Sequence, residues 1–517
     1  MTDLIGMWRW AEAEPDRRAV VDAEGNEYTF ADMACGANRT LHGLRAAGMN
    51  LEDNFAVVLP NSKQWWDFYF AAVQGGLYFT PLNYHLTPSE VSYVLNDAEV
   101  KLFVAHERFG AVAKAAAEQA GLPLDRCYAV GHIDGFRPVS DLLDGQPGTR
   151  PNGTTPGDRM MYTSGTTGKP KGIRRPLSKL SVDELWGRDA STRELYGYKL
   201  PDAVHLLAGP LYHSAPNSVA VGAMHSGHTV VMMDKWAPEE TLRLIEAYRV
   251  RTSHMVPTMF HRLLQLPDDV KYKYDLSSLA RIVHGAAPVS RHVKRRMIDW
   301  WGPILFEYFG STEVSGTGVM SDDWLARPGT VGKPWEGTEV RIVDDDGNDC
   351  PPNVAGRIFM RSLQPIFEYH KSPEKTEASR MGNWITVGDI GYLDDEGWLF
   401  PVDRETNMII SGGVNIYPAE TEAVFLEHDA VGDVAVFGVP NDEWGEEVKA
   451  VVELRDGFAP SEALAAELIE FSRSRIAHFK CPRSVDFRVD LPRAANGKLY
   501  KRLIREEFWQ GRDSRIL

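Results

Sequence analysis

Residues 162–172, with the sequence YTSGTTGKPKG, contain the residue types that bind phosphate. Glycines let the backbone adopt positive φ and approach a ligand closely, so that successive amide groups can point at one anion. Hydroxyl and ammonium groups add donors and positive charge. A Gly/Thr-rich surface turn is the simpler interpretation, but the length and order of this string favour a phosphate loop. The residues that we expect to bind phosphate are Thr163, Ser164, Gly165, Thr166, Thr167, Gly168, Lys169 and Lys171.

This loop differs from a Walker P-loop, although Gly168-Lys169 resembles the end of one. Thr163 stands where that motif needs its first glycine, and Pro170 stands where it needs Ser or Thr. The string resembles the phosphate loop of the adenylate-forming superfamily, which contains acyl-CoA synthetases, luciferases and the adenylation domains of peptide synthetases. The resemblance extends over essentially the whole chain, through five motifs in the family's order, and points to bacterial fatty-acyl-CoA synthetases.

The second motif, FEYFGSTE, occupies residues 306–313 and resembles the family's aromatic-Gly-x-Thr-Glu signature. The resemblance implies that Phe309 stacks on adenine, that Thr312 contacts a nucleotide phosphate and that Glu313 holds Mg²⁺. Tyr is commoner than Phe at the stacking position, and the change keeps the ring. A core strand with an aromatic pair is the structural alternative. The neighbouring residues that the same resemblance places at the nucleotide are Tyr308 and Gly310.

Two further strings complete the nucleotide site that the resemblance implies. Gly285, Ala286 and Ala287 look like a segment whose backbone lies against adenine and the acyl pocket, or are simply a tight turn. In residues 384–404, Asp389 matches the family's acceptor for the ribose hydroxyls, and Arg404 matches an Arg that reaches ribose or phosphate. Val387 replaces the usual Thr of that string and removes a hydroxyl from its neighbourhood.

The C-terminal motifs resemble three parts of the family's machinery, which are the domain hinge, the channel for CoA and the catalytic lysine. Gly412 and Gly413 resemble a turn that borders the pantetheine channel for CoA, and Thr406 stands at the family's pivot, where Asp or Lys is usual. In LPRAANGKLYKR, residues 491–502, Lys498 matches the catalytic lysine of adenylation. An isolated lysine is usually a solvated charge, so this assignment depends on the ungapped match to the motif.

The resemblance implies two half-reactions. A substrate carboxylate attacks the α-phosphate of Mg·ATP to give acyl-AMP and pyrophosphate, and the charge of Lys498, Glu313-bound Mg²⁺ and the loop donors assist. Rotation of the C-terminal domain then withdraws Lys498, and the CoA thiol attacks the activated carbonyl. The expected ligands are therefore ATP, Mg²⁺, CoA and a small-molecule carboxylic acid.

The acyl substrate is less defined than the chemistry. Many candidate acyl-pocket residues are small, which favours a long or bulky apolar tail, such as a fatty acid, an aryl-propenoate or a steroid-derived acid. His213 either gates the acyl site or caps a loop. The candidates are His213, Ala215, Ser218, Gly222, His284, Gly285, Val314 and Gly316.

Three other functions remain open. An amino-acid adenylation domain needs a carboxylate to bind the substrate ammonium, but residues 209–218 contain no Asp or Glu, which favours an amine-free acid. Transfer to a carrier protein instead of CoA would leave the adenylation motifs unchanged. A non-catalytic nucleotide-binding relative predicts loss of Lys498 or Glu313, and both are present.

The sequence pattern of the helices and strands that must position these residues predicts an α/β protein. Strands alternate with helices in the N-terminal part, which predicts βαβ units and a doubly wound, mostly parallel sheet. The expected strands are 55–59, 78–81, 102–105 and 280–284, and the expected helices are 31–47, 65–73, 88–96, 239–248 and 291–301. Residues 181–198 are polar and poorly periodic, and no element is predicted there.

Short strands with turns follow from about residue 327 to 402, which predicts a β-rich subdomain. We place a domain boundary before Arg404, giving an N-terminal adenylation domain of residues 1–403 and a small, mobile α+β C-terminal domain of residues 404–517. Helices are expected there at 419–426, 461–474 and 499–509, and strands at 434–439 and 448–454.

Composition excludes several classes of protein. A chain of 517 residues with a formal net charge of −16 and no Lys/Arg block is an improbable nucleic-acid binder. Four scattered cysteines favour a reducing compartment, and His225-x-x-His228 lacks further ligands at zinc spacing. No apolar stretch reaches about 18 residues, so we expect a soluble cytoplasmic protein without a transmembrane segment. A homodimer remains open.

Overall fold

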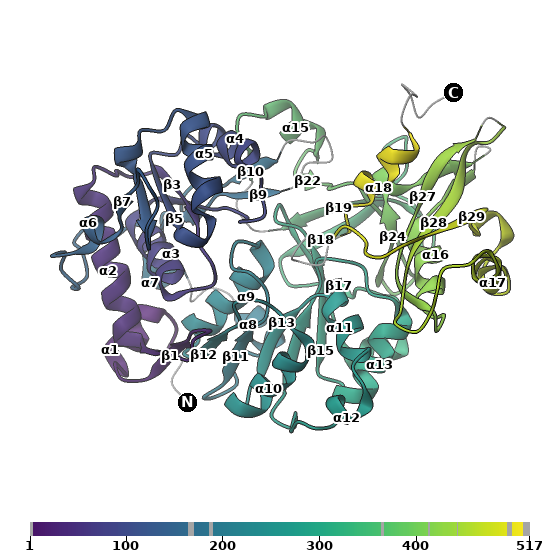
Figure 1. Ribbon diagram of the computed structural model, residues 1–517, viewed down its shortest axis with the longest axis horizontal. Coiled ribbons are helices and arrows are strands. Elements are labelled where there is room, and N and C mark those ends of the chain that lie inside the picture. Colours follow the sequence, from purple (N-terminus) through teal and green to yellow (C-terminus); the bar gives the residue numbers. More distant parts are fainter. Residues whose placement is uncertain are drawn as a thin grey trace. The chain divides into compact units, whose positions relative to one another are not determined.

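The computed structural model describes residues 4–163, 170–185, 190–362, 367–411, 414–441, 443–493 and 499–509. The chain divides into two compact units (Figure 1). The first comprises Met1–Met255, Leu266–Val283 and Leu363–Ser379. The second comprises Val256–Gln265, His284–Ser362 and Arg380–Leu517. Each is described separately, and the division of the chain at residues 403 and 404 stays a prediction.

The first unit contains a fully parallel sheet in the order β7-β6-β5-β3-β4-β8. Its strands are β3 (Asn54–Val58), β4 (Tyr78–Pro81), β5 (Leu102–His106), β6 (Cys127–Val130), β7 (Arg137–Pro138) and β8 (Asp158–Arg159). Helices precede and connect these strands, three of them at the predicted residues 31–47, 65–73 and 88–96 and two where none was predicted. They are α2 (Phe30–Ala46), α3 (Lys63–Gly75), α4 (Pro88–Asp97), α5 (Gly110–Ala120) and the short α6 (Ser140–Leu143).

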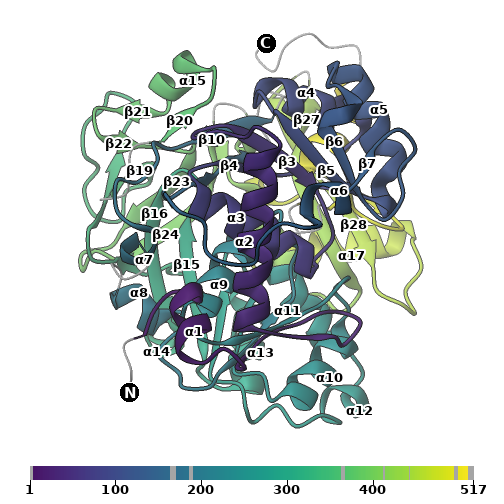
Figure 2. The same cartoon turned by 90° about the vertical axis from the view of Figure 1, so that its left-hand side faces the viewer.

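Successive side chains of each central strand enter opposite cores. In β3, Phe55 and Val57 pack with residues of α2 and α3, whereas Ala56 and Val58 pack with residues of α4 and α5. Figure 2 shows α4 and α5 beside the strands of this sheet. Because both faces are covered, the strands are continuous apolar runs. The doubly wound sheet is thus confirmed.

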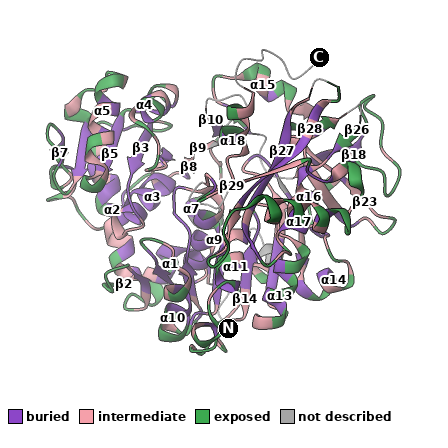
Figure 3. Cartoon of the chain, turned by 45° about the vertical axis from the view of Figure 1, so that its right-hand side comes forward, coloured by how far each residue is buried: buried purple, intermediate pink, exposed green. Residues whose placement is uncertain are grey.

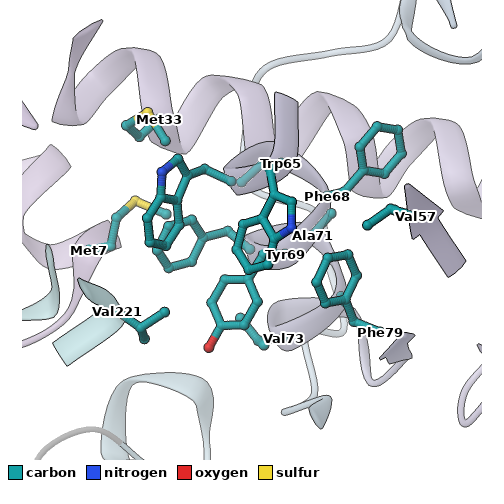
Figure 4. Packing of buried hydrophobic residues seen from close by; sticks show 14 of the residues in the cluster. Met7, Met33, Val57, Trp65, Phe68, Tyr69, Ala71, Val73, Phe79 and Val221 are labelled. Carbon is teal, nitrogen blue, oxygen red and sulfur yellow. The ribbon is translucent and has the colours of Figure 1, made fainter. Parts of the chain in front are cut away.

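Aromatic rings fill the core between this sheet and helix α3. Trp65 stacks on Tyr69 with ring centroids 5.4 Å apart and meets Phe79 edge-on at 5.1 Å (Figure 4). Buried aromatic rings of this size remove large apolar areas from water and prefer such offset and edge-on arrangements.

The rest of the first unit is a second sheet and a small one. The part of the second sheet that belongs to this unit has the order β14-β13-β11-β12-β1-β2, with β13, β11, β12 and β1 parallel and β2 antiparallel at the edge; the last residue of β14, His284, is counted with the second unit. Its strands are β1 (Arg18–Val21), β2 (Glu27–Thr29), β11 (Val204–Leu207), β12 (Thr229–Met232), β13 (Thr252–Met255) and β14 (Arg281–His284). The small sheet, in the order β20-β10-β9, contains β9 (Met161–Thr163), β10 (Lys171–Arg174) and β20 (Glu368–Tyr369).

The remaining helices of this unit are mostly short. They are α1 (Met7–Ala13), α7 (Val182–Leu185), α8 (Ala190–Leu195), α9 (Ser214–His225), α10 (Pro238–Tyr248), α12 (Asp268–Lys271) and α15 (Pro373–Ala378). The polar segment for which we predicted no element thus contains α7 and α8.

The second unit begins with an antiparallel ribbon and helices. The ribbon is β15 (Leu305–Gly310), β16 (Ser315–Met320) and β17 (Lys333–Pro334), and the helices are α11 (Pro257–Leu264), α13 (Arg291–Trp301) and α14 (Ser321–Ala326). An antiparallel sheet of short strands follows, as the β-rich prediction requires. Its strands are β18 (Thr338–Val343), β19 (Gly356–Ser362), β21 (Arg380–Met381), β22 (Trp384–Ile385), β23 (Asp389–Leu393) and β24 (Leu399–Arg404).

In the described part of the C-terminal region, a five-stranded sheet lies with three α-helices. The strands are β25 (Ile409–Ser411), β26 (Val414–Ile416), β27 (Val431–Asn441), β28 (Gly445–Leu454) and β29 (Ser484–Arg488), and the helices are α16 (Pro418–Phe425), α17 (Glu462–Arg473) and α18 (Lys501–Phe508). Buried residues follow β27 and β28, whereas α17 exposes most of its surface (Figure 3). The mixed α/β class is confirmed. Among the described residues, no helix is long and apolar enough to cross a membrane.

Candidate active site

Asp389 and Arg404 face each other on neighbouring antiparallel strands. Asp389 begins β23, Arg404 ends β24, and the two residues are direct partners in the strand register. Arg404 Nε donates to Asp389 Oδ1 at 3.1 Å. A carboxylate has about four acceptor positions, so this bond leaves capacity for two hydroxyl donors. The pair therefore has the chemistry expected of a ribose-binding group.

The charge of Asp389 depends on its surroundings. Burial raises the pKa of this carboxyl above its ordinary value, the Arg404 guanidinium opposes the rise, and the carboxylates of Asp403 and Glu313 add to it. Glu313 is thus near enough to act on the charge of Asp389, although the two belong to different sequence motifs. The fold brings the predicted ribose and metal ligands into one electrostatic neighbourhood.

We predict that Asp389→Asn raises the KM for ATP about 10- to 100-fold, because a hydrogen bond to a charged group contributes about 1.5–3 kcal/mol. Initial rates measured against ATP concentration check this. Asp349→Asn is the matched control, since it breaks an Asp–Arg pair with Arg341 at 2.6 Å on the surface of the same unit. An unchanged KM in Asp389→Asn would remove Asp389 from the nucleotide site.

The residues of the second motif lie where β15 turns into β16. Ser311 closes the turn: its amide donates to the Val314 carbonyl at 2.9 Å, and its hydroxyl accepts from the amides of Glu313 and Val314 at 3.2 and 3.3 Å. The strand pairing shifts between Phe309 and Gly310. This turn fixes the backbone on both sides of Thr312 and keeps Glu313 only 9% exposed.

Glu313 fits a magnesium site that is completed by the nucleotide. Within the described ranges, no group of three or more His, Cys, Asp or Glu residues could hold a metal ion by itself. Mg²⁺ commonly uses one or two carboxylates, with phosphate oxygens and water as the other ligands. A single, largely buried carboxylate matches that pattern and does not match a site made by protein alone.

The segment after β14 is closely packed and strained. A Cβ on Gly285 would lie 2.7 Å from ring atoms and from the carbonyl oxygen of Tyr308, so only glycine fits there. Ala286 has φ of 66°, a left-handed conformation that disfavours residues with a Cβ. Such strain persists only where the surrounding structure imposes it, and it is typical of ligand sites.

We predict that Ala286→Gly stabilises the protein by about 1 kcal/mol, because glycine adopts positive φ without the Cβ penalty. The measurement is the unfolding free energy in urea. Ala287→Gly is the control, since Ala287 is not among the positive-φ residues and its replacement should destabilise slightly. A loss of stability in Ala286→Gly would contradict strain at this position.

Two strands flank the predicted phosphate loop and are anchored within the first unit. On β9, Tyr162 donates its hydroxyl to Asp97 Oδ2 at 2.6 Å, and its ring fills the space beside Gly172, where a Cβ would lie 2.8 Å from Cζ. On β10, Lys171 Nζ lies 4.5 Å from the centroid of the Tyr369 ring. Thr163 pairs with Lys171 across the hairpin. The predicted residues Ser164, Gly165, Thr166, Thr167, Gly168 and Lys169 lie outside the described residues.

Comparison with known families decides what this arrangement belongs to. The AMP-binding enzyme family matches residues 7–370, and the AMP-binding enzyme C-terminal domain matches residues 420–498. The chain belongs to the AMP-binding enzyme family. It is therefore an adenylate-forming ligase, and its family uses ATP.

Relatives of this AMP-binding enzyme use different acyl groups and acceptors. A feruloyl-CoA synthase of an Amycolatopsis species is 32% identical, over 98% of this chain and 99% of the relative. The fatty acid–acyl-carrier-protein ligase ScoC of Streptomyces coeruleorubidus is 30% identical, over 96% and 95%. The structure of ATP-bound MatB from Rhodopseudomonas palustris is 28% identical, with a TM-score of 0.83 and 99% of both chains covered.

Four of the predicted acyl-site residues lie on or before helix α9 of this AMP-binding enzyme. His213 occupies the N-cap position of α9, but its side chain makes no capping hydrogen bond. Ala215 and Ser218 follow in the helix. Arg159 on β8 donates to Ser218 Oγ at 2.9 Å and also to the buried Asn217. Sequence reasoning missed Arg159, because a single Arg before the phosphate loop matches no motif.

The small residues do not leave empty space in this enzyme. In the first unit, a Cβ on Gly222 would lie 2.5 Å from the Tyr198 ring. In the second unit, a Cβ on Gly316 would lie 2.3 Å from the Phe309 carbonyl oxygen and 2.8 Å from Met360 Sδ, and Tyr308 fills the space beside Gly285. Val314 and His284 are buried. The inference from small residues to a bulky substrate is therefore not supported at these three glycines.

Two side chains that sequence reasoning did not single out fix the backbone near Asp389 and at the predicted hinge. Asp403 accepts hydrogen bonds from the Arg404 amide at 2.7 Å, the Asn407 side chain at 3.1 Å and the Ala419 amide at 2.9 Å. It thus joins β24 to the start of α16. Thr386 Oγ1 accepts from the Gly388 amide at 3.2 Å, so a hydroxyl one residue before Val387 supports the turn that delivers Asp389.

The other C-terminal predictions are only partly within the described residues. Arg505 donates to the backbone carbonyl of Thr406 at 3.5 Å, which links α18 to the predicted pivot. Gly412, Gly413 and Lys498 lie outside the described residues. Their roles stay predictions.

Proposed function

We propose that this adenylate-forming ligase activates a hydrophobic carboxylic acid with ATP, releases pyrophosphate, and transfers the acyl group from acyl-AMP to CoA. The observation that carries the proposal is the Asp389–Arg404 pair, with free acceptor capacity and with Glu313 acting on its charge. The coverage of both family matches supports it. Fatty-acyl and aryl-propenoyl CoA ligases among the relatives support the class of acid.

The proposed roles follow the chemistry of each group. Asp389 accepts the ribose hydroxyls, Phe309 offers a ring face to adenine, and Thr312 contacts a phosphate oxygen. The strained Ala286 and its neighbours hold backbone groups beside the base. The phosphate loop provides amide and hydroxyl donors. Glu313 would hold Mg²⁺, which supplies positive charge to the phosphates when bound.

The first half-reaction needs charge stabilisation and no general base. A carboxylic acid with a pKa of about 4 is already ionised at neutral pH. The difficulty is the approach of two anions, which Lys498 relieves by placing an ammonium group at the α-phosphate. The carboxylate oxygen bonds to phosphorus as pyrophosphate leaves. In the second half-reaction the CoA sulfur bonds to the acyl carbon, AMP leaves, and the thiol proton passes to solvent.

We assign residues 1–403 to adenylation and residues 404–517 to a C-terminal domain that changes position between the two half-reactions. The observation that supports this division is the cluster of hydrogen bonds at Asp403, a residue that lies between the two stretches matched by the family models. When the C-terminal domain changes position, Lys498 leaves the site and the channel for the CoA thiol forms, so that one site can serve both half-reactions.

A carrier protein is the competing acceptor, because the relative ScoC is named for transfer to one. A panel of fatty, aryl-propenoic and other apolar acids, assayed for pyrophosphate release with ATP and then for thioester with CoA, tests both choices. We expect thioester formation with CoA alone. Pyrophosphate release without any CoA thioester, followed by loading of a carrier protein, would replace CoA in the proposal. No release with any acid would refute adenylation.

A further inference from the structure

A fully buried ion pair lies beside the strained segment of the candidate site. Lys294 on α13 and Glu307 on β15 form an ion pair, and the exposed fraction of the surface is 0% for Lys294 and 5% for Glu307. His284, which precedes Gly285, is also completely buried, and its Nε2 lies 4.0 Å from Glu307 Oε2. All three residues belong to the second unit.

The surroundings of this pair are apolar and aromatic. The Trp324 ring centroid lies 4.8 Å from Lys294 Nζ, and Phe260 meets the His284 ring edge-on at 5.1 Å. Burial lowers the pKa of Lys294, whereas Glu307 opposes that effect. Removing two charges from water costs several kcal/mol for each ion, so an apolar pair of similar size is often as stable as a buried ion pair. Stability alone therefore does not account for these charges.

The position of the pair suggests what it does. Glu307 lies two residues before Phe309 on β15 and contacts the residue that precedes Gly285. Gly285 packs so closely on Tyr308 that no Cβ fits, and Ala286 is held at φ of 66°. Small movements between these segments would therefore disturb the contact. An ion pair has a preferred geometry that apolar side chains lack, so it can fix both segments relative to α13.

We propose that Lys294 and Glu307 are positioning residues that hold the Gly285–Tyr308 contact and the Phe309–Glu313 turn in the geometry that binds the nucleotide. The inference rests on the proposed function, because it takes the nucleotide to bind at these segments. Neither residue is proposed to touch the nucleotide. Both act through the backbone that they fix.

The experiment separates positioning from stability. Lys294→Met and Glu307→Leu each leave one buried charge without its partner and should lower Tm, whereas the double variant removes both charges and should regain most of the lost Tm. We expect the double variant to bind AMP at least about 10-fold more weakly than the wild type, because displacements of about 1 Å at a distance from the chemistry can have large effects. Titration calorimetry with AMP gives the affinity.

A further control is needed if the Lys294 and Glu307 variants have a lower Tm than the wild type, because lower stability by itself could weaken AMP binding. Leu468→Ala creates a cavity in the core beside α17 and should lower Tm without moving the nucleotide segments. AMP affinity is compared between variants with equal loss of Tm. Wild-type affinity in the double variant, or equal affinity in Lys294→Met and Leu468→Ala, overturns the proposal. Failure of the wild type to bind AMP would instead refute the proposed function, which keeps the two failures distinct.

Discussion

Lys498→Ala is expected to abolish acyl-AMP formation while retaining thioester formation from supplied acyl-AMP and CoA. The lysine charge is needed only where the substrate carboxylate approaches the α-phosphate, and loss of such electrostatic stabilisation lowers kcat about 10²- to 10³-fold or more. The second half-reaction starts from an ester in which that approach is complete. Pyrophosphate release measures the first step, and thioester appearance from synthetic acyl-AMP measures the second.

Lys480→Ala is the control for this comparison. Lys480 lies in the same unit, and its Nζ pairs with Glu420 at 2.7 Å, so its loss should leave both half-reactions close to wild type. Equal loss of both half-reactions in Lys498→Ala would show that Lys498 is not specific to adenylation. The assignment of its role would then be wrong.

The unfolding free energy is expected to fall steeply as the pH drops below about 6.5. Four buried histidines of the first unit have lowered pKa values: burial lowers that of His205 and His225 to about 3, and that of His228 and His254 to about 4. The folded state keeps them neutral, whereas the unfolded chain binds protons near the ordinary value of 6.5. Their stabilisation is complete above that pH and is lost as pH falls toward the folded values.

Each such proton changes the unfolding free energy by about 1.4 kcal/mol per pH unit, so four together give about 5 kcal/mol per unit between roughly pH 6 and 4. Asp67, Asp389, Glu422 and Glu453 act in the opposite direction, since burial raises the pKa of each carboxyl, that of Asp67 to about 6, so the slope for the whole protein is smaller than this sum. Typical stabilities of 5–15 kcal/mol therefore place acid unfolding in this range. Urea unfolding at several pH values gives the slope.

His225→Gln reduces the number of linked protons without removing a hydrogen-bond acceptor. His225 Nδ1 accepts from the Met7 amide at 3.1 Å, and a glutamine carbonyl can do the same. The slope of the unfolding free energy against pH should fall by about 1.4 kcal/mol per pH unit, the contribution of one linked proton. His132→Asn, at an exposed position, should leave it unchanged. A stability that stays constant between pH 7 and 5 would falsify the interpretation of these histidines.

Much of the secondary structure followed from local signals. The predicted helix at residues 88–96 is α4, where Thr87 and Glu90 form a capping box on either side of Pro88. The predicted helix over 291–301 is α13, which Ser290 caps through a bond from the Val293 amide. The strand over 78–81 is β4. Caps and apolar runs act over a few residues, and the sequence displays them directly.

Contacts through space could not be predicted in the same way. The space beside Gly222 is filled by Tyr198 and that beside Gly285 by Tyr308, but each pair is separated by a connection whose path the sequence does not show. The Lys294–Glu307 pair had one weak signal, a charged residue within the apolar run before Phe309. Motif matches singled out Asp389, Glu313 and Phe309 as candidates, and their roles stay predictions, whereas Asp403 and Arg159 matched no pattern and needed coordinates.

The contact between Gly285 and Tyr308 has a consequence for redesign of the site. A methyl group at position 285 would overlap both the Tyr308 ring and the Tyr308 carbonyl oxygen. A smaller side chain at 308 would remove the overlap with the ring and leave the overlap with the carbonyl oxygen, so libraries that vary 285, alone or together with 308, would sample mostly inactive proteins. In related sequences with the same backbone, glycine is therefore expected at the position of Gly285 whatever residue stands at that of Tyr308.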